Sequence, residues 1–417
     1  MDGADGAYEY PRLRPVEVLP LEVRGEAVFC LRDPLHYAEE PLYLRREVAP
    51  LLALFDGCHS VRDIQLLYAR RAGTLLFREA LDGLIRELDA HLYLEGPRFR
   101  AHRAELERAF REAPSRPARL AGQSYPAEPE ALRRELSAYF DHPDGPDGSL
   151  PSPEAARLAG LILPHIDFQR GGPCYAWGYR EAAGAPTAAR YVVLGTAHAP
   201  MTQPFAITRK DFETPLGAAE ADHDFLDGLL RRVDRAYLAD EFVHRAEHSI
   251  EFQAVFLRHQ AAAGQPVRIV PVLCGSFHRF VEAERSPAQA AEVAGFLAAL
   301  REAIAAAPGR TLVVASADLA HVGPQFGDRR PVTPGRLREV AEEDGALLAA
   351  AEAGDPEAVF AQVMREGDRR RICGLPPIYA ALSVLPGVHG RRLRYGQWPD
   401  PQASVTFAAM ALYGGPA

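Results

Sequence analysis

Leu161-Ile-Leu-Pro-His165-Ile-Asp167 decides the fold, because an apolar run ends here at a proline and a histidine. The pattern recurs in Tyr191-Val-Val-Leu-Gly-Thr-Ala-His198, where another histidine follows a β-branched run. It recurs again where Thr311-Leu-Val-Val-Ala-Ser316 precedes Asp318 and His321. In an open α/β sheet, the residues that follow parallel strands converge at one edge, where ligands bind. These segments therefore predict one site at the carboxyl edge of a sheet.

Two further segments add candidate residues to this site. Glu247-His248-Ser-Ile-Glu251 opens a helical pattern, so His248 is expected near a helix start with a carboxylate on either side. The two glutamates share one helix face and are either solvated or orient His248. In Arg371-Ile-Cys373-Gly-Leu-Pro-Pro377 the prolines suit a first helical turn. Cys373 is therefore expected near a helix N-terminus, where a thiolate is favoured.

Several histidines, a carboxylate and a cysteine at strand exits and helix starts are the residue types of a metal or redox site. Each residue also has a simpler explanation. Cys373 is also interpretable as a small buried hydrophobe, and Asp318 as a cap for the segment after its strand. The recurrence of the pattern favours a site over these separate explanations.

The C-terminal two thirds of the chain alternate between strand and helix patterns, which predicts an α/β layered fold with a mostly parallel sheet. Strands are expected near residues 159–163, 190–195, 267–273 and 311–316, and helices near 222–233, 248–260, 286–306 and 336–353. Two closing segments, 393–397 and 405–412, are expected to add edge strands.

The chain is long for one core, which predicts two domains. Ala113-Pro-Ser-Arg-Pro117 marks the break, so we expect domains at 10–112 and 116–417. In the first domain, Ser60-Val-Arg-Asp63 has the form of a capping box. Three helical patterns followed by a short strand at Leu92-Tyr-Leu94 predict a winged helix. Acidic residues slightly outnumber arginines there, whereas a DNA-binding domain should be basic. A protein or peptide partner is therefore favoured.

Composition excludes several classes of protein. Hydrophobic residues make up 47% and charged residues 25%, as in a globular protein in water. Five cysteines form no Cys-x-x-Cys pair, which is typical of a reducing cytoplasm. We expect neither a signal peptide nor a membrane-spanning helix. The net charge of −9 argues against general affinity for nucleic acid.

Residues 116–417 resemble the Memo family, known in prokaryotes as AmmeMemoRadiSam system protein B. Eight segments occur in the order of the family's motifs: Ala121-Gly-Gln-Ser-Tyr-Pro126, Pro164-His165, Leu194-Gly-Thr-Ala-His198, Glu247-His-Ser-Ile-Glu251, Ile269-Val-Pro-Val-Leu-Cys-Gly275, Ser316-Ala-Asp-Leu-Ala-His321, Ile372-Cys-Gly374 and Ser404-Val-Thr-Phe-Ala-Ala409. The resemblance implies the fold of class III extradiol dioxygenases, which hold iron(II) between two histidines and a carboxylate.

The resemblance also implies a ligand set of His165, His198 and Cys373. Iron(II) is the expected metal, with copper or zinc as alternatives, because two imidazoles and a thiolate suit all three. Three protein ligands leave positions open for water, dioxygen or substrate. The cysteine replaces the dioxygenase carboxylate, so this chain departs from dioxygenase chemistry at one ligand.

The remaining site residues are also implied by the resemblance. His321 matches an acid/base histidine oriented by Asp318, and His248 matches a further pocket histidine that contacts substrate or oxygen. The residues after His165 differ from the family pattern, as does Ala199 after His198. Asp167 and Arg170 are therefore candidates for a distinct substrate-facing rim.

The N-terminal segment is similar to PqqD-like domains, which bind peptides or partner proteins. The family's names imply an association with an AMMECR-like protein and a radical SAM enzyme. Two functions follow: a metal-dependent oxidoreductase related to dioxygenases, or a non-catalytic binding module that works with the radical SAM partner. A third is a thiol hydrolase, with Cys373 as nucleophile and His321 as base.

Overall fold

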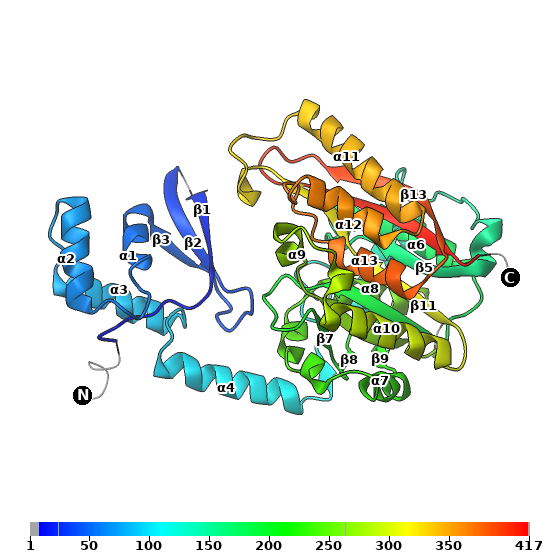
Figure 1. The fold of residues 1–417 in the computed structure, drawn as a ribbon, viewed down its shortest axis with the longest axis horizontal. Helices are drawn as coiled ribbons and strands as arrows, with labels where there is room; N and C mark the ends of the chain where they lie inside the picture. Colours follow the sequence, from blue (N-terminus) through cyan, green and yellow to red (C-terminus); the bar gives the residue numbers. More distant parts are fainter. Residues whose placement is uncertain (1–7, 24, 263, 416–417) are drawn as a thin grey trace. The chain divides into compact units, whose positions relative to one another are not determined.

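The chain divides into two units between Glu112 and Ala113, each with its own hydrophobic core (Figure 1). The computed structural model describes residues 8–23, 25–262 and 264–415. Among these residues, no helix combines the length and the apolar character needed to cross a bilayer.

The N-terminal unit places a three-stranded antiparallel sheet before its helices. In chain order its elements are β1 (Glu17–Val23), β2 (Glu26–Arg32), β3 (Leu42–Arg45), α1 (Ala49–Leu52), α2 (Val61–Ala72), α3 (Arg78–Ala90) and α4 (Pro97–Glu112). Leu31 and Ile64 are fully buried in its core. A buried ion pair between Arg14 and Asp33, with N and O atoms 2.8 Å apart, joins the sheet to the segment before it.

Of the local predictions for this unit, the capping box is confirmed and the strand at Leu92–Leu94 is wrong. Ser60 and Asp63 form the predicted capping box, with each side chain accepting a hydrogen bond from the other's backbone N–H. The strand expected at Leu92–Leu94 does not form, because Leu94 makes only an isolated bridge to Leu13 and the chain then enters α4. The observed strands lie before the helices, so no wing follows α3.

A nine-stranded mixed sheet forms the centre of the C-terminal unit. Its strands are β5 (Leu158–Leu163), β6 (Arg190–Thr196), β7 (Phe205–Ile207), β9 (Glu220–Ala221), β10 (Arg268–Cys274), β11 (Thr311–Ser316), β12 (Asp318–Val322), β13 (His389–Trp398) and β14 (Ser404–Tyr413). The main order is β12-β14-β5-β11-β6-β10-β7, with β13 paired to β14 and β9 to β10. The four strands predicted from apolar runs, which are β5, β6, β10 and β11, are confirmed and form the parallel centre.

The sheet is mixed, so the expectation of a mostly parallel sheet is correct only for its centre. β7, β12, β13 and β14 all pair antiparallel. β14 was expected at an edge, but it pairs with β5, β12 and β13, and every one of its residues is buried. A run as apolar as residues 405–412 is typical of such an interior strand, because both of its faces are covered.

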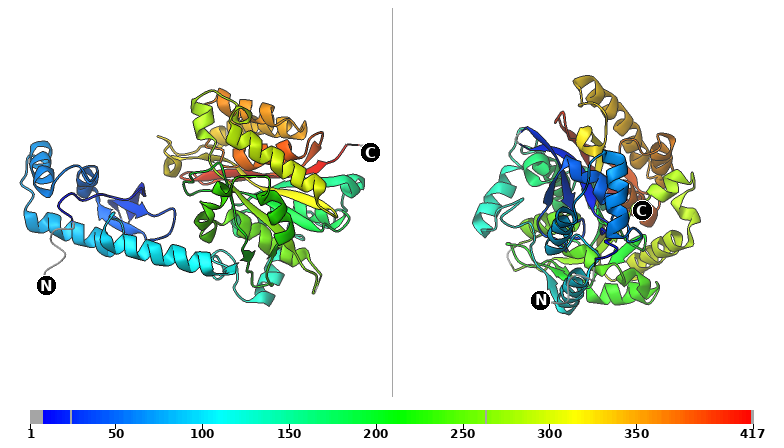
Figure 2. Two further views of the ribbon diagram at one scale, coloured as in Figure 1. Left: turned by 60° about the horizontal axis from the view of Figure 1, so that its bottom comes forward. Right: turned by 90° about the vertical axis from the view of Figure 1, so that its left-hand side faces the viewer.

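Helices cover both faces of this sheet (Figures 1 and 2). The helices of the unit are α5 (Pro129–Ala138), α6 (Phe168–Ala183), α7 (His223–Leu230), α8 (Ser249–Gln260), α9 (His278–Glu282), α10 (Ala291–Ala306), α11 (Pro334–Glu352), α12 (Pro356–Arg365) and α13 (Leu375–Val384). Val192 and Leu194 of β6 share a core with α10 and α13. Gly195 faces Ile250 of α8, so α8 and α13 lie on opposite faces, because successive strand residues alternate. A two-stranded sheet of β4 (Ser115–Arg116) and β8 (Asp211–Phe212) lies beside the main one.

We predict that Ile64→Ala destabilises the N-terminal unit alone. Removing three carbon atoms from this fully buried side chain should lower the free energy of unfolding of the N-terminal unit by about 2–5 kcal/mol. Both tryptophans, Trp177 and Trp398, lie in the C-terminal unit. Urea unfolding followed by circular dichroism should therefore show an earlier first transition, while the tryptophan fluorescence transition stays in place. A parallel shift of both signals would show that the units unfold together.

Candidate metal centre

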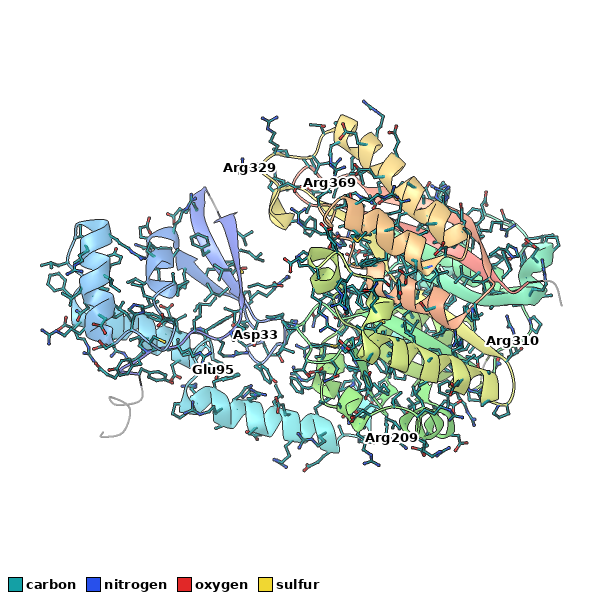
Figure 3. The ribbon with its side chains drawn as sticks, in the orientation of Figure 1. Asp33, Glu95, Arg209, Arg310, Arg329 and Arg369 are labelled. Carbon is teal, nitrogen blue, oxygen red and sulfur yellow. The ribbon has the colours of Figure 1, made fainter. Side chains whose placement is uncertain are left out.

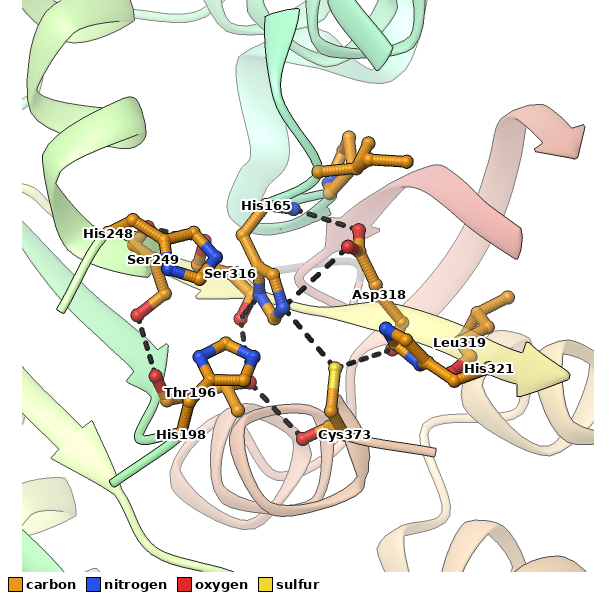
Figure 4. A network of polar contacts seen from close by, with 12 residues as sticks. His165, Thr196, His198, His248, Ser249, Ser316, Asp318, Leu319, His321 and Cys373 are labelled. Atoms are coloured by element: carbon orange, nitrogen blue, oxygen red, sulfur yellow. Dashed lines mark hydrogen bonds and ion pairs between the residues drawn. The ribbon is translucent and has the colours of Figure 1, made fainter. Parts of the chain in front are cut away.

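Three neighbouring parallel strands end at the same level and deliver the candidate residues together. Ser316 at the end of β11 pairs with Leu163 of β5 on one side and with Gly195 of β6 on the other. The residues that follow these strands therefore meet at one edge of the sheet (Figure 4). The predicted convergence of the strand exits is confirmed, and the network of polar contacts contains His165, His198, His248, Asp318, His321 and Cys373.

His165 is buried and fixed from two directions. Its backbone N–H donates to Asp318 Oδ1 at 2.9 Å. Its Nδ1 lies 3.0 Å from the carbonyl oxygen of Ser316, which only accepts hydrogen bonds, so Nδ1 carries the proton. Nε2 therefore keeps its lone pair and faces the site, as a metal ligand requires. Burial also lowers the pKa of His165 to about 3, which keeps the ring neutral.

Glu247 organises the other two histidines of the cluster. Its carboxylate accepts the backbone N–H groups of His198, His248 and Ser249 at 2.8–3.0 Å. The same oxygens lie 3.1 Å from His198 Nδ1 and 3.2 Å from His248 Nδ1. The side chain of Glu247 is only 4% exposed. One buried carboxylate thus fixes the orientation of both rings and leaves their Nε2 atoms free to bind a metal.

His165, His198 and His248 together form a group that could hold a metal ion. One ligand atom from each lies within 4.8 Å of the others. The rings of His198 and His248 are stacked, with centroids 4.7 Å apart, and the ring of His165 stands edge-on to both. The side chains of His198 and His248 are 40% and 34% exposed, so the group is open to solvent on one side. Sequence reasoning assigned His248 to substrate contact, whereas the structure places it beside the two predicted ligands.

Gly195 explains how α8 comes close enough to complete this group. A Cβ atom at this position would lie 2.6 Å from both Ile250 Cγ1 and Ser249 Oγ. Glycine therefore allows the first turn of α8 to lie directly against β6. His198 follows β6 and His248 precedes α8, so this close approach brings the two rings together.

The pKa values of the clustered histidines differ because their neighbours differ. Partial loss of surrounding water lowers the pKa of His248, despite the opposing effect of Glu247. Displacement of water also lowers the pKa of His198, but the Glu247 carboxylate and Cys373 outweigh it and hold that pKa well above its usual value. Burial alone would raise the pKa of the Glu247 carboxyl. His198 and His248 outweigh this effect and hold that pKa well below its usual range.

Cys373 lies next to the histidine group. Its Sγ is 3.3 Å from His165 Nε2, and its carbonyl oxygen accepts a hydrogen bond from Thr196 Oγ1 at 3.2 Å. A Cβ atom at Gly374 would lie 2.3 Å from the carbonyl oxygen of Asp318, so glycine allows this close passage. The expected position just before a helix is confirmed, but the expected thiolate is not favoured. Burial outweighs His198 and raises the pKa of Cys373.

Asp318 and His321 both start from β12 but do not form the expected pair. Asp318 is buried and holds the backbone of His165, and burial raises the pKa of its carboxyl. His321 Nδ1 instead lies 3.2 Å from the carbonyl oxygen of Leu319, to which it donates. No hydrogen bond joins the Asp318 and His321 side chains in the described part of the chain. The orienting role expected for Asp318 therefore acts on His165.

Arg116 and Arg370 support the site, and sequence reasoning missed both. Arg116 donates to the carbonyl oxygens of His244 and Glu247 at 2.7 and 2.8 Å and pairs with Glu251. Glu251 therefore belongs to a buried network behind the site and does not orient His248. Arg370 pairs with Asp344, and its carbonyl oxygen accepts the His321 backbone N–H at 2.7 Å. Arg116 and Arg370 pair with Glu251 and Asp344, which are distant from them in sequence. No local sequence pattern marks such a pair, so neither arginine could be identified from the sequence.

The rim candidates Asp167 and Arg170 have a simpler local role. Asp167 caps α6 by accepting the Arg170 backbone N–H at 3.1 Å, and the two side chains form an ion pair with N and O atoms 2.6 Å apart. The thiol hydrolase hypothesis requires a hydrogen bond between Cys373 and His321. The described partners of Cys373 Sγ are His165, His198 and the carbonyl oxygen of Asp318 instead, and the raised pKa of the thiol disfavours a nucleophile.

Fold and site thus define an α/β protein with a histidine cluster at the carboxyl edge of its parallel strands. A family model described as "Memo-like protein" matches residues 116–410, and the chain belongs to this family. A MEMO1 family protein of Aquifex aeolicus is 26% identical over 92% of this chain and 96% of its own length. A MEMO1 family protein of Methanopyrus kandleri is 32% identical over 67% of this chain and 91% of its own length. One of Thermus thermophilus is 28% identical over 81% of this chain and 93% of its own length.

We predict that Glu247→Gln weakens metal binding by about 10- to 100-fold, the loss expected when a partner that orients metal ligands is removed. The amide keeps the size of the side chain, but its NH₂ group cannot accept from the N–H donors that surround Glu247. Titration of metal-free protein with Zn²⁺ measures the effect. Glu282→Gln, at an exposed glutamate of α9, is the control. Unchanged affinity in Glu247→Gln would contradict the role assigned to the carboxylate.

Proposed function

We propose that this protein is a metal-dependent oxidoreductase related to the class III extradiol dioxygenases. The observation that carries this proposal is the group of three imidazoles, His165, His198 and His248, whose ligand atoms lie within 4.8 Å of one another. The Nδ1 atoms of all three rings face fixed oxygen atoms, which is how proteins hold histidines that bind a metal. The cluster is also partly open to solvent, which suits a reactive centre better than a structural one.

The proposed ligand set has two constant members and two candidates for the third position. His165 and His198 belong both to the set implied by the family motifs and to the geometric group. His248 completes the geometric group, and Cys373 completes the motif set, with its Sγ 3.3 Å from His165 Nε2. Three nitrogen donors, or two with a sulfur, fit iron(II) as well as copper or zinc, and iron(II) is our first choice.

A metal bound here would supply Lewis-acid or redox chemistry at its open coordination positions. The chain itself supplies a proton acceptor beside that centre. Burial lowers the pKa of His321 to about 4, so the ring is neutral at pH 7 and holds a transferred proton only weakly. Because Nδ1 donates to the Leu319 carbonyl oxygen, the lone pair of His321 is on Nε2. We propose that His321 Nε2 takes a proton from the substrate and returns it later.

Metal content separates the two ligand sets. Full-length protein purified without oxygen should contain close to one metal ion per chain. His165→Ala and His198→Ala should weaken binding by more than about 100-fold, beyond the loss expected for an orienting partner. Loss of metal in His248→Ala with retention in Cys373→Ala identifies the three-histidine set, and the reverse result identifies the motif set. His321→Gln is the control and should keep its metal. The proposal fails if His165→Ala and His198→Ala bind metal as the unchanged protein does.

A second candidate function is that of a binding module, and the surface of the N-terminal unit favours it. Leu75 and Phe77, in the segment between α2 and α3, are 78% and 67% exposed, and Leu66 on α2 is 54% exposed. Gln65 Nε2 donates to the carbonyl oxygen of Leu76 at 2.8 Å, which holds this segment against α2. We propose that these side chains dock a partner, with the radical SAM enzyme or the AMMECR-like protein as candidates. Exposed apolar groups held on a fixed surface are typical of docking sites.

We predict that Leu75→Asp and Phe77→Asp each weaken this docking by about tenfold or more, because a charge replaces an apolar contact. Co-purification of the full chain with each candidate partner measures the effect, and Leu150→Asp, at an exposed leucine of the C-terminal unit, is the control. Metal content should stay unchanged in all three variants. Equal recovery of partner with all variants would remove this segment as the docking surface.

A further inference from the structure

A pocket of about 230 Å³ opens beside the metal centre, and His198 and Cys373 form part of its lining. Phe277, Leu375 and Pro376 contribute apolar walls. The volume lies below the roughly 300–1,000 Å³ of pockets that bind drug-sized molecules. The pocket therefore suits a small ligand with an apolar part.

Two oppositely charged residues of the same short segment also line this pocket, namely Asp368 and Arg371. Both have left-handed backbone conformations, with φ of 52° and 53°. Residues with a Cβ atom rarely adopt this conformation, and bulky ones such as arginine do so at a cost. Such strain in native proteins is concentrated at ligand-binding and active sites. Here it places one cationic and one anionic side chain at the same pocket.

The guanidinium of Arg371 has fixed partners and keeps donors available. Nη1 donates to the carbonyl oxygens of His321 and Arg369 at 3.2 and 3.3 Å, and Nη2 donates to Asp328 Oδ1 at 2.9 Å. Nε has no hydrogen-bond partner among the described residues, and Nη2 keeps a second N–H. The side chain is 38% exposed, so a ligand can reach it. Together these N–H groups can bind a carboxylate.

Asp368 likewise keeps one carboxylate oxygen available. Its Oδ1 accepts the backbone N–H of Ile372 at 2.8 Å, which fixes the side chain. Its Oδ2 lies 3.9 Å from His278 Nδ1, which is beyond hydrogen-bond distance but close enough for an ion pair when His278 is protonated. The side chain is 18% exposed. Oδ2 can therefore accept a hydrogen bond from a ligand ammonium group.

We propose that this pocket binds a small zwitterion of the α-amino acid type. Its carboxylate would bind Arg371, its ammonium group would bind Asp368, and its apolar side chain would lie along Phe277 and Leu375. A simple anion would leave Asp368 Oδ2 without a donor, and a simple amine would leave the remaining Arg371 N–H groups without an acceptor, so a ligand with both groups satisfies both residues. This inference rests on the proposed function, because the pocket shares His198 and Cys373 with the metal centre, and it names the class of substrate.

Three compounds with the same branched apolar group test the proposal: L-leucine, 4-methylpentanoate and 3-methylbutylamine. Calorimetric titration of the full chain, with and without added Fe²⁺, should show L-leucine binding about tenfold or more tighter than the other two. Equal affinities, stronger binding of the acid or the amine alone, or no heat with any compound would overturn the proposal. Metal content measured in the same samples separates the two ideas. Preference for L-leucine without metal binding would reject only the metal-dependent function, and metal binding without this preference would reject only the zwitterion.

Asp368→Asn and Arg371→Asn test the two charged residues individually. Asparagine tolerates the left-handed conformation and can still accept the Ile372 N–H in place of Asp368. Each variant should bind L-leucine about tenfold or more weakly while keeping its circular dichroism spectrum and metal content. Arg329→Asn removes an exposed arginine of the neighbouring loop and is the control, with unchanged binding (Figure 3). Full affinity in both pocket variants would show that the pocket does not recognise a zwitterion.

Discussion

The register of three parallel strands is the constraint on which the site depends. Ser316 at the end of β11 lies opposite Leu163 of β5 and Gly195 of β6, so the three strands end together. A one-residue slip would move every side chain of a strand to the other face of the sheet. The buried valines and leucines of these strands, packed on both faces, therefore fix the register. The position of the functional groups at the edge follows from packing in the core.

Glu247 supplies the second constraint, which is electrostatic. A carboxylate removed from water is unstable unless donors surround it. Glu247 accepts three backbone N–H groups and lies next to the Nδ1 atoms of His198 and His248. Because these donors come from the exit of β6 and the start of α8, the carboxylate joins two elements that are distant in sequence. Its burial thus contributes to the fold and to the orientation of both rings.

The amino-acid sequence predicts the centre of the sheet and most of the cluster, because both depend on local patterns. Apolar runs identify β5, β6, β10 and β11, and a histidine or aspartate after a strand identifies the edge where they meet. β14 was misplaced, because an apolar run does not say which strands will flank it. Arg116 was missed because its partner, Glu251, is brought to it only by the tertiary fold. The closeness of His248 to the other two histidines depends on Gly195, a constraint that appears only when β6 and α8 are packed together.

The segment that carries Cys373 shows how the core supports an unfavourable backbone. The left-handed conformation at Arg371 costs about 1–2 kcal/mol, whereas aspartate at position 368 tolerates it because its short polar side chain bonds locally. Between them and Cys373, Arg370 is buried and pairs with Asp344 and Glu366, which anchors the segment. Glycine at either position would give the same path at lower cost. Both positions instead carry charged residues, and both line the pocket beside the histidine cluster. Asp368 and Arg371 also make structural contacts, with the Ile372 N–H and with Asp328, so these side chains hold the segment in place as well as line the pocket.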